Sequence, residues 1–392
     1  MPPESLPVNA EPHVLVDATA IPANRGGVGR NLEFLVPALD RLGVRMTVVA
    51  QPRDAEWLRA AAPNSTVVTP SSLPSSRPLR LAWEQFSLPG IARRAGANVI
   101  FSPHYTMPLL TRVPVVVALY DAIFFSHPEL HSRLKRMFFR FWIRRSLARA
   151  AACVAPSEAT RSELLRLVRP RHDRIRLAPL GVDPGTFHRP QPAETLAAAE
   201  LVGSNNWIAF LGTLEPRKNV ANLVRAFGIL ATDGRVASRF PDLRLALAGG
   251  RGWDDSIDGA IADSPVRERV IRLGFVPNEV LAGVLGSSLS TAYPSYGEGF
   301  GFPVLEAMAC GSPIVTTRYL SLPEVGGDVA VYTETDPQSI AAGLIGLLSD
   351  DDERVKRGER GIERAASFTW EASARAHLDA FVGAAASTKR TV

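Results

Sequence analysis

Two glutamates and a series of glycines stand close together in the stretch YPSYGEGFGFPVLEAMACG at residues 293–311. Pro303 stands where a helix would begin and Gly311 where it would end, the usual asymmetry of a short helix. Backbone N–H groups of a glycine loop at a helix N-terminus bind anions. The carboxylates of Glu298 and Glu306 cannot bind a phosphate, but they accept hydrogen bonds from hydroxyls. This combination suits a sugar nucleotide.

A cationic pair, Arg217 and Lys218, lies in the stretch GTLEPRKN at residues 212–219, between an expected strand and an expected helix. The helix dipole slightly disfavours cations at this position, so the pair favours a functional interpretation over a solvated helix start. A planar arginine fork and a compact lysine charge together suit two phosphates. Such preorganised cations stabilise a diphosphate that leaves with growing negative charge.

The elements that position these residues are predicted by apolar runs that alternate with helical segments, which indicates parallel sheets covered on both faces. The expected strands lie at residues 13–18, 46–50, 98–101, 115–119, 152–155, 175–177, 207–211, 243–248, 270–273, 290–293, 314–316 and 329–332. Ligands bind beyond the carboxyl ends of such strands, where the glycine turns fall. We therefore expect an α/β protein of two doubly wound, Rossmann-like domains that face each other across a cleft.

The first domain is expected at residues 13–188 and the second at 203–366, joined by a linker at 190–203. The turn NRGGVGR at residues 24–30 resembles a dinucleotide-binding turn, but Leu32 stands where its third glycine belongs. Gln51 replaces the acid that would hold a ribose. These two departures argue against nicotinamide or flavin binding.

Composition describes a globular protein: 392 residues, 46% hydrophobic, with 44 basic and 39 acidic residues and a formal charge of +5. Cys153 and Cys310 match no metal or redox spacing and are interpreted as reduced thiols. No apolar run approaches the roughly 18 residues of a membrane span, and the start lacks the pattern of a secretory signal. We expect a cytoplasmic protein.

The ordered motifs GTLEPRKN at 212–219, LGFVP at 273–277, and Glu298 and Glu306 with seven residues between them resemble glycosyltransferase family 4. The stretches PLGVD at 179–183 and SLPEVG at 321–326 fit as well. The resemblance runs from about residue 13 to about 385. It implies the GT-B fold, a nucleotide-sugar donor, retention of anomeric configuration, and neither a metal nor another cofactor. It also implies that a final helix at 369–385 packs on the N-terminal, acceptor-side domain.

The resemblance assigns roles to individual residues. Catalytic roles fall to Glu298, Arg217, Lys218 and Asp121. Donor binding falls to Gly26, Gly27, Phe275, Val276, Gly299, Phe300, Gly301 and Glu306. Apart from the resemblance, His104 follows an expected strand end and Arg30 an expected glycine turn, so both are candidates, with Tyr120, for contacts to the sugar or the acceptor, although a lone histidine in a turn is more often structural. Glu298 would accept hydrogen bonds from the sugar hydroxyls and Glu306 from the ribose hydroxyls.

One motif departs from the family. Many relatives carry His-Asp after the strand that ends near residue 119, whereas this chain has Tyr120 and Asp121. A phenol is no near-neutral base, so both residues are assigned to orientation of the acceptor or sugar. In a retaining enzyme the leaving phosphate can take the acceptor proton on the same face. The alternative is a sugar-nucleotide-binding protein that has lost activity.

The segment at residues 132–149 carries seven basic residues, no acid, and apolar residues at helical spacing: Leu134, Met137, Phe138, Phe141 and Trp142. Such a helix either packs its apolar stripe on the sheet or lies at an anionic membrane surface. The second alternative fits transfer onto a lipid-linked glycan at the inner membrane face. No nucleic-acid-reading motif accompanies the basic residues.

The likeness to mannosyltransferase members of the family favours GDP-mannose as donor and a glycan or lipid-linked glycan as acceptor. A UDP- or dTDP-sugar with a small soluble acceptor is the alternative.

Overall fold

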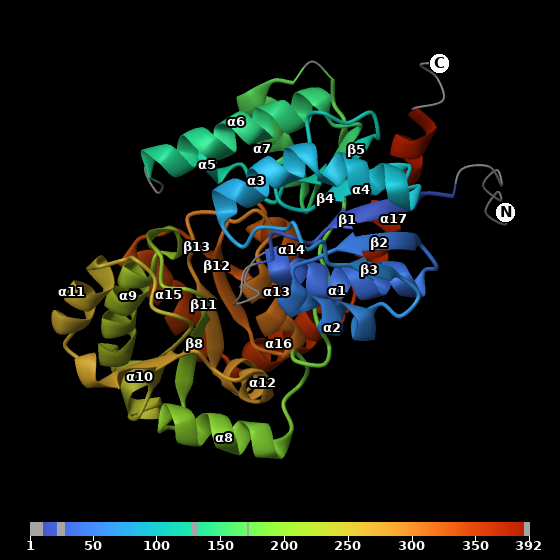
Figure 1. Cartoon of the computed structure of the whole chain (residues 1–392). Coiled ribbons are helices and arrows are strands. Elements are labelled where there is room, and N and C mark those ends of the chain that lie inside the picture. The colour runs from blue at the N-terminus through green and yellow to red at the C-terminus, as the bar shows by residue number, and fades with distance from the viewer. Residues whose placement is uncertain (1–10, 22–27, 127–131, 171, 388–392) are drawn as a thin grey trace, which may run out of the picture. The chain divides into compact units, whose positions relative to one another are not determined.

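The computed structural model describes residues 11–21, 28–126, 132–170 and 172–387, so Gly26 and Gly27 lie outside the described residues. The chain divides into two compact units. Unit 1 comprises Met1–Gly181 and Thr369–Val392, and unit 2 comprises Val182–Phe368. Each unit is a parallel sheet covered by helices (Figure 1).

Unit 1 contains seven parallel strands in the order β3-β2-β1-β4-β5-β6-β7. The strands are β1 (His13–Asp17), β2 (Arg45–Val49), β3 (Thr66–Val68), β4 (Val99–Ser102), β5 (Val115–Ala118), β6 (Ala152–Ala155) and β7 (Ile175–Leu177). The helices are α1 (Val28–Arg41), α2 (Pro52–Ala61), α3 (Arg77–Phe86), α4 (Leu88–Ala95), α5 (Ile123–Ser126), α6 (Arg133–Arg149), α7 (Glu158–Val168) and α17 (Trp370–Ser387). All residues of β1, β4, β5 and β6 are buried, as expected for strands covered on both faces.

The C-terminal helix α17 packs on unit 1, against α1 and strands β4, β5 and β6. The Trp370 ring stacks on the Phe34 ring at a centroid distance of 5.5 Å. The ring centroids of Phe381 and Phe101 are 5.2 Å apart. A Cβ atom on Gly181 would lie 2.3 Å from the backbone nitrogen of Trp370. A side chain at position 181 is therefore excluded by the start of this helix.

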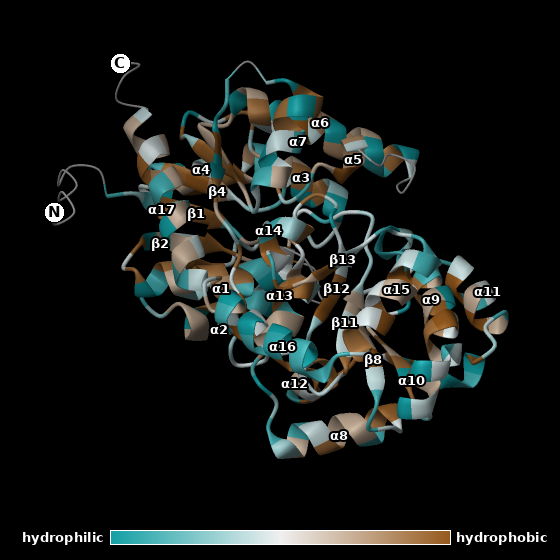
Figure 2. Ribbon diagram, turned by 180° about the vertical axis from the view of Figure 1, so that it is seen from behind, coloured by the Kyte–Doolittle hydropathy of each residue, from teal (hydrophilic) through white to brown (hydrophobic). Residues whose placement is uncertain are grey.

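Unit 2 contains six parallel strands in the order β10-β9-β8-β11-β12-β13. The strands are β8 (Trp207–Leu211), β9 (Arg244–Ala248), β10 (Val270–Gly274), β11 (Ser290–Tyr293), β12 (Ile314–Thr317) and β13 (Val331–Thr333). The helices are α8 (Pro192–Val202), α9 (Val220–Thr232), α10 (Gly234–Arg239), α11 (Ser256–Ala262), α12 (Asn278–Gly286), α13 (Phe302–Ala309), α14 (Leu322–Gly326), α15 (Pro337–Leu348) and α16 (Asp351–Ala365), with short 3₁₀ turns η2 (Pro216–Lys218) and η3 (Arg267–Arg269). Figure 2 shows hydrophobic residues concentrated on strands such as β12.

The linker predicted at residues 190–203 is wrong, because this segment forms helix α8 and packs on α12. The two helices approach closely because α12 has a glycine at the contact: a Cβ atom on Gly283 would lie 2.1 Å from the carbonyl oxygen of Glu194. Unit 2 also begins earlier than the predicted residue 203. The backbone N–H of Val182 donates to the carbonyl of Phe368 at 3.1 Å, which joins the first and last residues of unit 2.

Candidate active site

The loop between β11 and α13 requires its glycines. Gly297 has a φ of 153° and Gly301 a φ of 106°, conformations that residues with a Cβ atom rarely adopt. A Cβ atom on Gly297 would also lie 2.7 Å from a methyl group of Leu320. Helix α13 begins at Phe302, one residue before the predicted start, and Gly311 follows it with a φ of 81°.

Glu298 lies in this loop with only 12% of its side chain exposed. Its Oε1 atom accepts hydrogen bonds from the Tyr293 hydroxyl at 2.7 Å and from the Ser295 hydroxyl at 3.1 Å, and it forms an ion pair with Arg217. Burial alone would raise the pKa of Glu298, but the charges of Arg217 and Lys218 hold the pKa below its usual value. Glu298 is therefore ionised at neutral pH.

Arg217 lies in the 3₁₀ turn η2 beyond the carboxyl end of β8. Its guanidinium donates to the carbonyl of Gly297 at 2.8 Å and to Glu215 Oε1 at 2.7 Å, besides the ion pair with Glu298. Burial lowers the pKa of Arg217, and the neighbouring carboxylate of Glu298 raises it by more. Arg217 is therefore protonated, and its hydrogen bonds join the loop after β8 to the loop after β11.

Lys218 is buried, and its Nζ atom lies 3.9 Å from Glu215 Oε1. Burial lowers the pKa of Lys218, and the charges of Glu298, Glu215 and Glu306 oppose this shift. A Cβ atom on Gly212 would lie 2.3 Å from Lys218 Nζ, so the ammonium group lies against the bare backbone at the end of β8. This arrangement leaves a desolvated cation available to an anionic ligand.

Backbone hydrogen bonds fix the two loops to each other. The N–H of Tyr296 and the hydroxyl of Ser295 both donate to the carbonyl of Arg217, at 2.9 Å and 3.1 Å. Asn219 has a φ of 60° and donates through Nδ2 to the carbonyl of Pro294 at 3.2 Å. The Ser321 hydroxyl lies 2.8 Å from the carbonyl of Glu298 and bonds the loop from its other side. The cationic turn and the glutamate loop therefore form one rigid site.

The remaining predicted donor residues lie in unit 2 as well. Glu306 lies on α13 with 2% exposure, and its charge acts on Lys218. Phe300 is buried against Phe302 and Phe368, with ring centroids 5.5 Å and 5.9 Å away. After β10, Phe275 is 84% exposed while Val276 is buried, so Phe275 is not part of the core.

Two of the predicted residues of unit 1, Tyr120 and Asp121, follow the carboxyl end of β5. The Tyr120 hydroxyl accepts a hydrogen bond of 2.5 Å from Asn31 on α1, and burial raises the pKa of Tyr120 above its usual value. Asp121 accepts a hydrogen bond of 3.4 Å from the N–H of Ile123. Arg30 lies in the first turn of α1. Tyr120 is thus a neutral phenol, as the sequence indicates.

His104 belongs to a buried network that the sequence does not reveal. Its Nε2 atom lies 3.2 Å from Asp17 Oδ2 at the end of β1 and 3.9 Å from Glu84 Oε2 on α3. One ligand atom each from Asp17, Glu84 and His104 lies within 4.8 Å of the other two, so the three atoms are close enough to bind one metal ion. Arg80 also contacts two of the three residues, since its Nη1 atom lies 3.2 Å from Glu84 Oε2 and 3.4 Å from His104 Nε2. The network therefore joins the end of β1, helix α3 and the turn after β4 through buried polar contacts.

Sequence reasoning missed several residues that complete the site. In unit 2 these are Glu215, Tyr293, Ser295 and Asn219. Glu215 lies two residues before Arg217 in the same motif, so its carboxylate could have been found there. Asp17 could have been found as the acid that ends the first apolar strand, whereas nothing in the sequence pairs it with Glu84.

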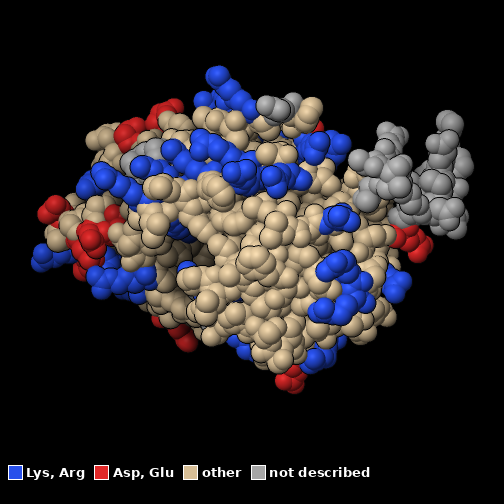
Figure 3. Space-filling view, turned by 45° about the horizontal axis from the view of Figure 1, so that its top comes forward, with Lys and Arg blue, Asp and Glu red and all other residues tan. Residues whose placement is uncertain are grey.

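The basic helix α6 contains two different halves. Its buried residues are in the C-terminal half: Trp142, Ile143, Ser146 and Leu147. Its N-terminal half exposes the apolar residues Leu134 by 79%, Met137 by 67%, Phe138 by 37% and Phe141 by 47%. Only Trp142 of the predicted stripe is buried, and the other four residues are exposed. Figure 3 shows Lys and Arg side chains gathered in a band on the face that carries this helix.

In the described part of the chain, none of the helices combines the length and apolar character that crossing a bilayer requires.

Comparison with known families covers almost the whole chain. Residues 25–186 match the family described as Glycosyltransferase Family 4, and residues 194–364 match the family described as Glycosyl transferases group 1. The chain is 35% identical over 260 residues to the O-antigen chain mannosyltransferase B of Escherichia coli, a match that covers 65% of this chain and 67% of the relative. It is 34% identical over 215 residues to the D-inositol 3-phosphate glycosyltransferase of Corynebacterium jeikeium (strain K411), a match that covers 52% of this chain and 50% of that relative.

Solved structures share the fold at low sequence identity. The Anabaena protein HepE, solved in complex with UDP and glucose, matches with a TM-score of 0.71 and 17% identity over 94% of this chain and 98% of its own. WaaG, a glycosyltransferase involved in lipopolysaccharide biosynthesis, matches with a TM-score of 0.69 and 14% identity over 93% of this chain and 98% of its own. The two parallel-sheet, Rossmann-like units are those of the GT-B fold.

Proposed function

The chain belongs to glycosyltransferase family 4, and we propose that it transfers mannose from GDP-mannose to a glycan or lipid-linked glycan with retention of anomeric configuration. The observation that carries this proposal is the buried set of Arg217, Lys218 and Glu298, in which two cations and one ionised carboxylate meet beyond the ends of β8 and β11. The 35% identity to an O-antigen chain mannosyltransferase supports mannose as the sugar.

In this proposal, Arg217 and Lys218 stabilise the leaving diphosphate. As the bond between the sugar C1 atom and the diphosphate oxygen breaks, negative charge grows on the diphosphate, and Lys218 and Arg217 stabilise it from fixed positions. A desolvated cation interacts with such a charge more strongly than an exposed one, because water screens it less. The proposed reaction needs no metal, since the two side chains supply the positive charge.

Glu298 binds the transferred sugar in this proposal. Its carboxylate stays ionised and is already oriented by Tyr293, Ser295 and Arg217, so it can accept hydrogen bonds from sugar hydroxyls without rearranging. Glu306 accepts hydrogen bonds from the ribose, and the amides of residues 299–301 bind the sugar and the diphosphate. The backbone at Phe275 and Val276 contacts the base, and the exposed Phe275 ring is free to cover it.

The acceptor hydroxyl forms the new bond to C1 on the face from which the diphosphate leaves, and its proton passes to a departing phosphate oxygen. This route requires no protein base, which agrees with a neutral phenol at Tyr120. Asp121 and Tyr120 orient the acceptor or the sugar, and His104 is a positioning residue whose imidazole is held by Asp17. Arg30 at the start of α1 adds positive charge. Gly26 and Gly27, which lie outside the described residues, keep their predicted role in donor binding.

A membrane-bound acceptor is supported by α6. Its four exposed apolar residues, accompanied by arginines, have the character of a helix that lies in the interface of an anionic bilayer. We therefore place the protein in the cytoplasm, peripherally at the inner membrane face. The alternatives are a UDP- or dTDP-sugar donor with a soluble acceptor, and an inactive sugar-nucleotide-binding protein.

Nucleotide preference and turnover test this proposal. A ligand that binds only the folded state raises the melting temperature, so GDP should raise it more than UDP, ADP or dTDP at equal concentration. GDP-mannose should then release GDP in the presence of membrane extract containing lipid-linked glycans. Preference for UDP or dTDP would favour the second donor class, and binding without release of any diphosphate would favour an inactive binding protein.

A further inference from the structure

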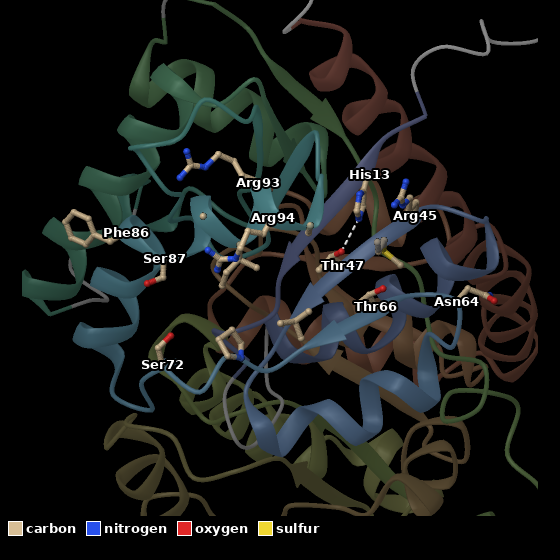
Figure 4. Close-up of a pocket in the computed structure, with 16 residues that line it drawn as sticks. His13, Arg45, Thr47, Asn64, Thr66, Ser72, Phe86, Ser87, Arg93 and Arg94 are labelled. Carbon is tan, nitrogen blue, oxygen red and sulfur yellow. Dashed lines mark hydrogen bonds between the residues drawn. The ribbon is translucent and has the colours of Figure 1, made fainter.

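A groove of about 860 Å³ lies within unit 1, between α4 and the strands β1, β2 and β3. None of the residues assigned to sugar transfer lines it. Figure 4 shows His13 and Arg45 at one end, Phe86 and Ser87 at the other, and Arg93 and Arg94 between them. This volume lies in the range of about 300–1,000 Å³ that is usual for organic ligands and far exceeds the space that a bare phosphate needs.

The floor of the groove is polar because of the strand register. His13 pairs with Arg45 and Thr47 pairs with Thr66, so residues 13, 45, 47 and 66 share one face of the sheet. His13 and Thr47 are buried, and His13 Nε2 lies 3.0 Å from Thr47 Oγ1. Arg45 and Thr66 are exposed at the starts of β2 and β3, so the floor combines a buried polar pair with two polar groups open to solvent.

The walls carry positive charge from three arginines. Arg45, Arg93 and Arg94 are exposed and enter no ion pair with the described residues of the chain. No Asp or Glu is among the residues that line the groove. Arg94 extends over Gly90, where a Cβ atom would lie 3.5 Å from its Nη1 atom. Because three like charges border one hollow, the groove favours an anion.

We propose that this groove binds an anionic oligosaccharide, with its carboxylate or phosphate groups paired to Arg93, Arg94 and Arg45. Guanidinium groups bind both kinds of anion through two parallel hydrogen bonds. The hydroxyls of Thr66 and Ser87 supply partners for sugar hydroxyls, and so does the amide oxygen of Asn64, whose amide nitrogen donates to Asp40. The ring of Phe86, 74% exposed, offers an apolar surface to a sugar ring. The inference does not depend on the proposed transfer.

Titration calorimetry of the full chain tests the proposal with four probes: trigalacturonate, a phosphorylated mannotriose, neutral mannotriose and inorganic phosphate. The two acidic saccharides should bind, and their affinity should fall with added salt. The double change Arg93→Gln with Arg94→Gln should weaken this binding about tenfold or more, because it removes two charge-assisted contacts. The control is Arg112→Gln, an exposed arginine of unit 1 outside the groove, which should leave the affinity unchanged.

Measuring GDP affinity in the same variants distinguishes the groove from the proposed transfer site. GDP affinity should be the same in the double variant and the unchanged protein, since no transfer residue lines the groove. Equal binding of neutral mannotriose, or inorganic phosphate binding as tightly as the saccharides, would overturn the ligand class. Absence of acidic-saccharide binding, or the same affinity in the double variant and the unchanged protein, would overturn the site.

Discussion

Arg217 and Glu298 form an ion pair that joins the loop after β8 to the loop after β11. Their side chains are 18% and 12% exposed, and each has a further fixed partner: Glu215 for the arginine and Tyr293 for the glutamate. A buried pair of this kind is weak evidence for stability, because desolvation opposes the attraction between the charges. Its position beyond two strand ends favours a functional reason for keeping it.

Replacing Glu298 tests its proposed contact with the sugar. Glu298→Gln keeps the size of the side chain but removes the charge, and we expect kcat to fall by about 10²-fold or more while GDP still binds. Glu298→Ala leaves Arg217 paired with Glu215 alone and removes the acceptor of the Tyr293 hydroxyl, so it should also destabilise unit 2 by about 1–3 kcal/mol. GDP release and the melting temperature measure the two effects. Normal turnover in Glu298→Gln would contradict the assignment.

Lys218→Met tests the diphosphate contact. The change keeps a flexible side chain in the buried position and removes its charge, so we expect kcat to fall by about 10²-fold and GDP affinity to fall about tenfold. Lys356→Met on the exposed surface of α16 is the matched control and should alter neither value. The same rates and GDP affinity in Lys218→Met and in the control would exclude Lys218 from the diphosphate site.

The glycine loop was predictable because its backbone chemistry is local. Gly301 and Gly311 border α13 in conformations that favour glycine, and Pro303 fits the first turn. The ion pair between Arg217 and Glu298 was harder to predict from the sequence. Its two residues are far apart along the chain, and their loops come together only because β8 and β11 are neighbours in the sheet. The sequence motif placed both residues near the donor, but it did not show that Arg217 is already bound by Glu215 and Gly297.

The linker prediction failed because composition does not reveal which segment packs on a helix, and the two alternatives for residues 132–149 stay predictions. Segment 190–203 begins and ends with turn-forming residues, yet its alanine-rich centre forms α8 and packs on α12. In α6 both halves contact the rest of unit 1, since Phe139 stacks on Phe124 at a centroid distance of 4.2 Å, and Trp142 and Leu147 are buried. The residues of the apolar stripe that precede Trp142 are nevertheless exposed. Leu134 has the same hydrophobicity as a core residue but is 79% exposed.

His377 on α17 makes the stability of unit 1 depend on pH. Burial lowers its pKa from 6.5 to about 4, although its hydrogen bond to the carbonyl of Ser373 opposes this shift. The folded state therefore binds the proton less readily than the unfolded state. The stabilisation is full above pH 6.5 and is lost as pH falls toward 4, by about 3 kcal/mol. Chemical denaturation at several pH values measures this slope.

His377→Leu is the variant that isolates this contribution, because leucine fills a buried site without a titrating group. Its melting temperature should change less between pH 7 and pH 5 than that of the unchanged protein. His172→Leu, a change at an exposed position, serves as the control and should keep the full slope. An identical pH dependence in His377→Leu and the unchanged protein would show that His377 is protonated at its ordinary pKa in the folded state.

The exposed apolar half of α6 should bind anionic bilayers. Leu134→Ser with Met137→Ser removes apolar surface that is 79% and 67% exposed, so the fold should keep its stability within about 0.5 kcal/mol. Co-sedimentation with phosphatidylglycerol vesicles should fall at least about tenfold, because each buried side chain of this size contributes about 1.5–3 kcal/mol. Leu196→Ser, 62% exposed on α8, is the control. If the unchanged protein sediments equally with neutral and anionic vesicles, or the double variant still binds, α6 is not the membrane contact.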